Sequence, residues 1–122
     1  MRFHRFDVVK VPFPFTDRPV HKFRPALVVS DHEEFGGPVG HSVMAMITSA
    51  RHSRWPLDVI IEDLSAAGLP APSLVRMKLF TLDHRLIQSA LGSIGARDRR
   101  AVSSALARLL NLPGGPGLDV PP

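Results

Sequence analysis

The sequence of 122 residues contains no cysteine, only three lysines and no long apolar run. Without cysteine the chain cannot form a disulfide scaffold, a thiolate metal site or a cysteine nucleophile. No segment approaches the roughly 18–20 consecutive apolar residues that a membrane helix needs. The first residues, MRFHRFDVVKV, carry charges but lack the apolar core and small-residue cleavage site of a signal peptide. We therefore expect a cytoplasmic protein.

Arginine takes the place of the scarce lysine and supplies twelve of the fifteen cationic side chains. Eleven acidic residues oppose them, so the formal net charge is +4. The guanidinium group is a planar, permanently charged fork that suits phosphate, although a solvated surface can use lysine or arginine equally well. The excess of arginine therefore favours a nucleic acid or another phosphate-bearing partner. With 44% hydrophobic and 21% charged residues, the chain has the composition of a folded globular domain.

Short segments rich in apolar and β-branched residues predict five strands and a weaker sixth. In the fifth, Val75, Met77 and Leu79 alternate with Arg76 and Lys78, which predicts that both cations lie on one face of the strand. Many short strands at spacings of about 10 to 15 residues indicate a small, strongly bent sheet or a partly open barrel. The expected strands cover residues 5–13, 25–30, 42–49, 57–62, 74–80 and 89–94.

Helical patterns are fewer, so the expected fold class is mainly β with peripheral helices (α+β). Asp83 is a candidate N-cap for a helical turn over residues 84–88. Apolar residues recur at helical spacing from Arg97 to Asn111 and predict one clear C-terminal helix. Residues 31–40 are expected to form a loop.

The chain is expected to be one domain over residues 1–111, followed by a tail. Residues 112–122 are so rich in proline and glycine that they cannot bury a core of their own. We therefore expect a flexible segment there.

A basic loop ends at Arg24, where the residue types suit a phosphate. The loop also carries Arg18, His21 and Lys22, and Pro25 favours an extended Arg24 at the entrance of the next strand. The Arg24 guanidinium can donate two parallel hydrogen bonds to a phosphate. On position alone, an ion pair with Asp17 or Asp31 is an equally open interpretation.

A second cluster follows the third expected strand. Thr48 and Ser49 end that strand, and three potential cations come directly after them: Arg51, His52 and Arg54. Hydroxyls and cations near Trp55 suit single-stranded nucleic acid, which binds through phosphate contacts and stacking. The same residues are also compatible with hydroxyls that only bond local backbone and with a solvated loop anchored by Trp55.

The sequence offers no recognisable cofactor site. Its histidines show neither H-x-x-x-H nor H-E-x-x-H spacing, and no glycine-rich phosphate loop or G-x-S-x-G elbow occurs. We therefore expect neither a metal nor another cofactor.

Five segments together resemble the PemK/MazF family of toxin endoribonucleases. They occur in the order of that family and span about residues 5 to 110, whereas each alone would be a weak signal. The segments are VPFPFTD at residues 11–17, RPALVVSD at 24–31, MITSA at 46–50, GLPAPSLVRMKLFTLD at 68–83 and the closing helix at 97–110.

The resemblance implies a small SH3-like barrel that forms a homodimer and cleaves single-stranded RNA without a metal, leaving 2′,3′-cyclic phosphate and 5′-OH ends. It matches the catalytic arginine of the family to Arg24 and its strand-end hydroxyl to Thr48, with Ser49 beside it. Pro25 and residues 14–23 match the flap next to the RNA groove. The partner it implies is an antitoxin whose disordered, often acidic tail fills that groove.

Three points stay open at the level of sequence. Arginine exchanges protons poorly, so His21 and His52 are the candidates for proton transfer. Arg76 and Lys78 either line the RNA groove or form a solvated strand face. The polar pair that many relatives carry near residues 77–80 is missing here, so the cleavage sequence is not predicted.

Two other functions remain as alternatives to the ribonuclease. One is a non-catalytic toxin of the same architecture that binds a protein target such as gyrase, and the other is a barrel that only binds nucleic acid. The presence of both Arg24 and Thr48 favours the enzyme, because the gyrase-poisoning toxins lack this pair.

Overall fold

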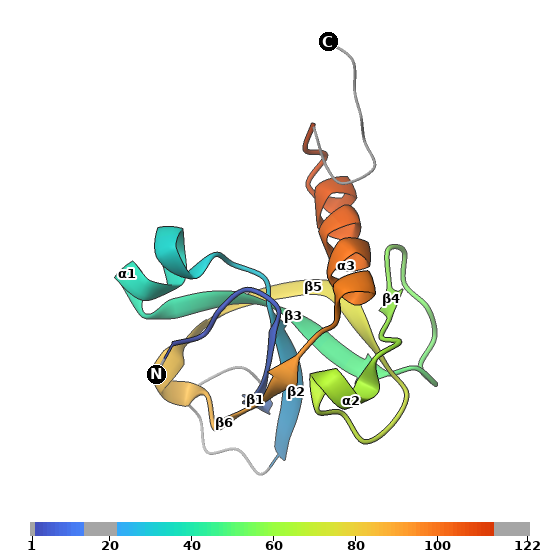
Figure 1. Ribbon diagram of the computed structural model, residues 1–122, viewed down its shortest axis with the longest axis horizontal. Coiled ribbons are helices and arrows are strands. Elements are labelled where there is room, and N and C mark those ends of the chain that lie inside the picture. Colours follow the sequence, from blue (N-terminus) through green and yellow to red (C-terminus); the bar gives the residue numbers. More distant parts are fainter. Residues whose placement is uncertain (1, 14–21, 114–122) are drawn as a thin grey trace.

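A computed structural model describes residues 2–13 and 22–113 of the chain (Figure 1). Its described residues form a curled, antiparallel half-barrel of six strands with the order β4-β5-β3-β2-β1-β6. The mainly β fold with a C-terminal helix is thereby confirmed. The strands are β1 (Asp7–Phe13), β2 (Lys22–Val28), β3 (His41–Ser49), β4 (Val59–Ile60), β5 (Ser73–Asp83) and β6 (Ser89–Ser93).

Short helical segments connect the strands, and one long helix follows them. A helical turn over His32–Gly36 continues into α1 (Gly37–Val39), and α2 (Leu64–Ala67) precedes β5. A 3₁₀ turn over His84–Leu86 links β5 to β6, and α3 (Ala96–Leu109) ends the described fold. No helix among the described residues is long and apolar enough to cross a membrane.

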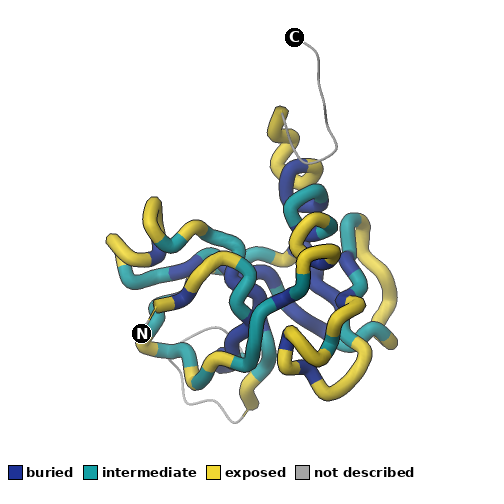
Figure 2. The backbone as a smooth tube through the Cα atoms, viewed as in Figure 1, coloured by how far each residue is buried: buried dark blue, intermediate teal, exposed yellow. Residues whose placement is uncertain are grey.

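Two clusters of buried apolar residues pack against the curled sheet. Figure 2 shows the buried stretches along the strands and along α3. Successive strand residues point to opposite faces, so Val8 and Leu27 join the cluster under α3 whereas Val9 and Val28 join the other. Buried on both sides, the central strands read as nearly continuous apolar runs in the sequence. Helix α3 contributes Val102, Ala105 and Leu106 to the first cluster.

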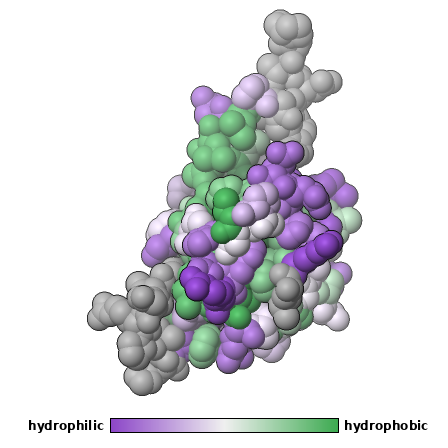
Figure 3. Space-filling model, turned by 90° about the vertical axis from the view of Figure 1, so that its left-hand side faces the viewer, coloured by the Kyte–Doolittle hydropathy of each residue, from purple (hydrophilic) through white to green (hydrophobic). Residues whose placement is uncertain are grey.

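The end of α3 is less enclosed than its beginning. Leu110 and Leu112 are more than half exposed there, and Leu109 is exposed as well. Figure 3 shows hydrophobic surface in the upper part of the coloured molecule, and mixed hydrophilic and hydrophobic surface below it.

A buried carboxylate fixes the start of α3. The Asp98 side chain is 1% exposed and accepts hydrogen bonds from the backbone N–H groups of Glu62 and Asp63 and from Arg97 Nη1, all at 3.1 Å. Asp98 lies in the first turn of α3, where an acidic side chain is favourable to the helix dipole. In the structure it also satisfies two backbone donors ahead of α2, which ties α3 to that segment.

Most sequence-based expectations for the elements are confirmed, with three differences. The expected strand at 57–62 is reduced to Val59–Ile60. The expected loop at 31–40 is wrong, because the Asp31 carboxylate accepts from the N–H of Glu34 at 2.8 Å and so caps a helical turn. Residues 114–122, most of the expected tail, lie outside the described residues.

The third difference concerns the two cations of β5. Ala45 of β3 pairs with Leu79 of β5, but the next residue, Met46, pairs with Arg76. Met77 and Lys78 therefore bulge out of the ladder, and the alternation assumed for this strand is broken. Arg76 is buried and Lys78 is exposed, so they do not form one solvated strand face, which was one of the two alternatives that the sequence left open.

Candidate functional site

The strand pairing brings Arg24 and Thr48 to the same pocket. β2 and β3 are antiparallel with Ala26 opposite Met46, and continuing this register by two residues sets Arg24 level with Thr48. Both residues line a pocket at the end of these strands, and Pro25 and Ser49 line it with them. Four residues that the sequence singled out from separate segments thus lie together.

The other wall of the pocket is the segment that leads from α2 into β5. Leu69, Pro70, Ala71, Pro72 and Ser73 line it, and the N–H of Ala50 donates to the carbonyl of Pro72 at 3.1 Å. The pocket holds about 230 Å³, less than the roughly 300–1,000 Å³ usual for a drug-sized ligand. It therefore suits a phosphate or part of one nucleotide within a longer ligand.

The Arg24 side chain is held by an aromatic ring and keeps an unused donor. Its guanidinium carbon lies 4.9 Å from the centroid of the Phe13 ring, which is a cation–π distance. The Nε atom is buried and has no hydrogen-bond partner within residues 2–13 and 22–113. A buried donor without a partner calls for an explanation, and an anionic ligand in the pocket supplies one.

The Thr48 hydroxyl contacts an imidazole. Thr48 Oγ1 lies 2.7 Å from Nδ1 of His52. His52 follows Thr48 by four residues, and β3 ends between them at Ser49. The chain turns instead, with the N–H of His52 donating to the carbonyl of Ser49 at 3.1 Å, and the turn brings the imidazole back to Thr48.

The remaining candidates are more dispersed. Arg51 and Arg54 are exposed in the loop after β3, Lys22 is exposed at the start of β2, and Lys78 is exposed in the β5 bulge. None of these four lines the pocket. Arg18 and His21 lie outside the described residues.

Arg76 has a structural position that its sequence context did not suggest. Its Nε and Nη2 atoms donate to the two carboxylate oxygens of Asp58 at 3.2 and 2.9 Å, and its guanidinium lies over the Trp55 ring. Burial alone would raise the pKa of Asp58, but hydrogen bonds from Arg76 and the Trp55 N–H outweigh it and lower that pKa. The pair fixes the loop after β3, which argues against Arg76 as a groove-lining residue.

Sequence reasoning gave the segment from Leu69 to Ser73 no role, although it forms a whole wall of the pocket. The feature of the sequence that points to this segment is the pair of prolines at positions 70 and 72, because proline restricts the backbone. Rigid apolar residues shape a site without supplying its chemistry, so a search for reactive side chains passes over them.

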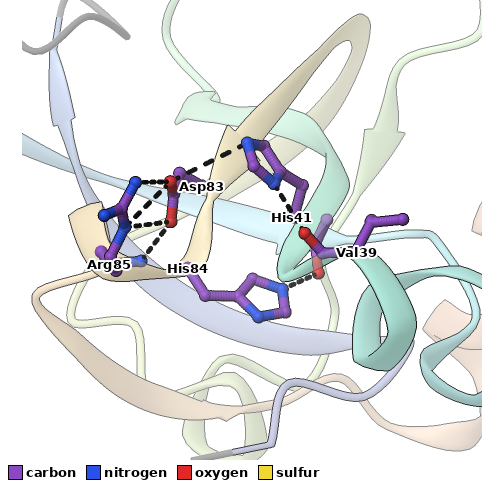
Figure 4. A network of polar contacts seen from close by, with 6 residues as sticks. Val39, His41, Asp83, His84 and Arg85 are labelled. Atoms are coloured by element: carbon purple, nitrogen blue, oxygen red, sulfur yellow. Dashed lines mark hydrogen bonds and ion pairs between the residues drawn. The ribbon is translucent and has the colours of Figure 1, made fainter.

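A second polar cluster occupies the opposite end of β3 (Figure 4). The Arg85 guanidinium donates hydrogen bonds to the Asp83 carboxylate oxygens at 2.7–3.2 Å. This contact holds the pKa of Asp83 well below its usual range. Ser42 Oγ lies 2.7 Å from Nε2 of His84. Burial of the His84 imidazole, and then the nearby His41, lower the pKa of His84.

The lowered pKa of His84 predicts that the folded protein loses stability in acid. The groups that face it are His41, His32 and Asp83. The pKa of His84 is below its ordinary value of 6.5 in the folded state, so the unfolded chain binds this proton first as the pH falls. The free energy of unfolding should therefore decrease as the pH falls below about 6.5, the ordinary histidine value.

Urea unfolding of wild type and His84→Gln between pH 5 and 7.5 measures this effect. The variant should lose part of the decrease, whereas His52→Gln, outside the cluster, should keep it. An equal pH dependence in wild type and His84→Gln would contradict the assignment.

Comparison with solved structures shows the same fold in toxins. An endoribonuclease in complex with its cognate antitoxin, from a mycobacterial species, is 19% identical, with a TM-score of 0.71 over 91% of this chain and 97% of that one. A MazE–MazF complex from Deinococcus radiodurans (Form-III) is 23% identical, with a TM-score of 0.72 over 91% and 98%. The Mycobacterium tuberculosis toxin MazF-mt6 is 19% identical, with a TM-score of 0.66 over 87% and 97%.

The family itself follows from the sequence match. None of the curated proteins compared matches this chain. Residues 4–110, however, match the family model of the PemK-like, MazF-like toxins of type II toxin–antitoxin systems. That match spans most of the chain and includes the residues that line the pocket. The chain therefore belongs to the PemK-like, MazF-like toxin family.

Proposed function

We propose that this toxin is an endoribonuclease that cleaves single-stranded RNA, without a metal ion, through attack by the 2′-hydroxyl of the RNA. The observation that carries the proposal is the pairing of Arg24 and Thr48 in one pocket, with the Nε donor of Arg24 buried and unpartnered among the described residues. A pocket with one permanent cation and two neighbouring hydroxyls, Thr48 and Ser49, suits a phosphodiester.

RNA carries its own nucleophile, so the protein needs to align it and to stabilise charge on the phosphate. The Arg24 fork binds the non-bridging oxygens, and its charge offsets the negative charge that grows as the 2′-oxygen approaches phosphorus. The Phe13 ring under the guanidinium limits its movement, which prepares this donor before RNA binds.

Thr48 presents its hydroxyl to the RNA from the neighbouring strand. Its side chain is rigid at χ1 because it is β-branched, and the residue is 6% exposed, so its hydroxyl keeps a fixed position at the pocket. Attack by the 2′-oxygen expels the 5′-oxygen of the next nucleotide. The products are a 2′,3′-cyclic phosphate and a 5′-OH end.

A single-stranded substrate fits the small pocket better than a duplex does. A nucleotide whose base is unstacked can turn its sugar and phosphate into about 230 Å³, whereas a paired strand is held in the A-form helix. The exposed cations of Arg51 and Arg54 lie on the loop after Thr48, where they can contact flanking phosphates.

The assembly expected for the family completes the proposal. Two of the similar structures are complexes with an antitoxin, and we infer that this chain likewise binds a cognate antitoxin and forms a homodimer. An RNA substrate places the free toxin in the cytoplasm. An antitoxin segment bound over the Arg24 pocket would block RNA and inhibit the toxin.

Incubation of purified protein with a mixed-sequence single-stranded RNA in EDTA tests the proposed activity. We expect endonucleolytic fragments in the presence of the chelator and none from the same sequence as a perfect duplex. RNA that remains intact in EDTA and is cleaved once Mg²⁺ is restored would contradict the metal-independent reaction.

A further inference from the structure

The bond between Thr48 and His52 links a buried pocket hydroxyl to an exposed imidazole. Thr48 Oγ1 lines the pocket and is 2.7 Å from Nδ1 of His52. His52 itself is exposed, on the far side of the turn that ends β3. A proton that reaches this imidazole can therefore pass to bulk water.

Among the described residues that line it, the pocket has no proton acceptor that works near neutral pH. The polar side chains among its described lining residues are Arg24, Thr48, Ser49 and Ser73, with no carboxylate and no imidazole. Arginine stays protonated in proteins, and a lone hydroxyl is a weak base. Imidazole, in contrast, titrates close to physiological pH, which suits general acid–base catalysis.

We propose that His52 accepts, by relay through Thr48, the proton that the attacking 2′-hydroxyl must lose. This inference rests on the proposed ribonuclease function. With neutral His52, Nδ1 accepts the Thr48 O–H, which leaves a lone pair of Oγ1 free to accept a hydrogen bond from the 2′-hydroxyl of the RNA.

The bonds broken and formed in the relay balance within a single step. The 2′-O–H bond breaks as the proton moves to Thr48 Oγ1, and the original Thr48 proton moves to Nδ1 of His52. The 2′-oxygen forms its bond to phosphorus while the bond from phosphorus to the 5′-oxygen breaks. The leaving oxygen takes a proton from water, and the His52 imidazolium returns its proton to solvent.

The surroundings of His52 permit this cycle. Among the described residues, the charged side chains of its own loop are Arg51, Arg54 and Asp58, the last paired with Arg76. Arg24 lies on β2 at the pocket, and the wall from Leu69 to Ser73 contributes no titratable side chain. The hydrogen bond between the His52 N–H and Ser49 holds the turn by backbone alone. A side-chain substitution at position 52 therefore leaves the turn in place.

The test is the pH dependence of kcat/KM for cleavage of one RNA oligonucleotide by wild type, His52→Gln, Thr48→Val and His41→Gln. For wild type we expect log kcat/KM to rise with a slope of one on the acidic side of the profile and then to level off. His52→Gln should lower kcat by about 10²- to 10⁴-fold, the usual size of general-base catalysis.

Three readouts separate proton transfer from a structural role. In His52→Gln, KM should stay within a few-fold of wild type, the acidic limb of the profile should disappear, and the melting temperature should be unchanged. Thr48→Val should lose the same limb because the relay is broken. His41→Gln should keep the full wild-type profile, since its position is seven residues or about 23 Å along β3 from Thr48.

Wild-type rate and an unchanged acidic limb in His52→Gln, together with an inactive Arg24→Ala, would overturn the relay and leave the ribonuclease function standing. Wild-type protein that cleaves no RNA at any pH would overturn the function, and the relay with it.

Discussion

Arg24→Ala is expected to lower kcat for RNA cleavage by about 10³-fold, the upper range for loss of one preorganised charge donor at a reacting group. The reason is geometric as well as electrostatic, because the guanidinium lies on the Phe13 ring and Arg24 lines the pocket with a buried, unpartnered Nε among the described residues. Removal of the side chain takes away the cation that the proposal places on the scissile phosphate. Single-turnover cleavage of an end-labelled RNA measures the loss.

Arg24→Lys is the matched variant for this prediction. It keeps the charge but not the planar fork, so it should recover only a small part of the lost rate. The buried Nε has no partner among the described residues, and the variants should therefore retain the melting temperature of wild type within a few degrees. Full activity in Arg24→Ala would show that the pocket is not the site of cleavage.

Gly68→Ala is expected to cause the largest loss of stability. Gly68 ends α2 with φ at +71°, and a Cβ atom there would lie 2.0 Å from the backbone oxygen of Leu91 in β6. A left-handed backbone costs an ordinary residue roughly 1–2 kcal/mol, and overpacking costs about 1–3 kcal/mol more. The sum corresponds to a decrease of about 10–20 °C in melting temperature.

Gly40→Ala separates the cost of the left-handed backbone from the cost of the close contact. Gly40 has almost the same φ, +69°, but a Cβ atom added there would have no described atom within 4 Å. Its substitution should therefore cost only the backbone term, about 4–8 °C. Thermal unfolding followed by circular dichroism compares the two, and equal losses would contradict close packing of α2 on β6.

The Gly68 contact also bears on the site. Leu69 follows it directly and begins the wall of the pocket. Gly92 in β6 in turn lies close to the α2 backbone, since a Cβ atom there would lie 2.4 Å from the carbonyl oxygen of Ala66. The wall that faces Thr48 thus depends on two glycines that do not themselves line the pocket. Gly68→Ala should therefore reduce cleavage by more than the smaller folded fraction alone explains.

The sequence predicted most strands because their cause is local. Residues 7–13 and 41–49 combine β-branched and apolar side chains that are buried on both faces of the sheet, and such runs are visible without a structure. Arg24 and Thr48 were also singled out from the sequence, since each lies at the end of an expected strand beside other polar residues. Their proximity was not visible from either segment alone, because it depends on the register between β2 and β3.

The features that were not predicted depend on contacts that one segment alone does not reveal. The burial of Arg76 was not predicted, because it depends on Asp58, eighteen residues earlier, and on a bulge opposite Ala45. The contacts of Asp98 were not predicted either, because its partners are backbone groups of Glu62 and Asp63. The contact of His52 with Thr48 depends on the turn that follows β3.

The chemistry of the RNA ends distinguishes attack by the 2′-hydroxyl from hydrolysis by water. RNA cleaved in EDTA by wild-type protein is labelled at its new 5′ ends with kinase, with and without prior phosphatase, and the 3′ ends are treated with mild acid to open cyclic phosphates. We expect 5′-OH ends that label without phosphatase and 2′,3′-cyclic phosphates, both absent with Arg24→Ala. Fragments with 5′-phosphate and 3′-OH ends would contradict the proposed reaction.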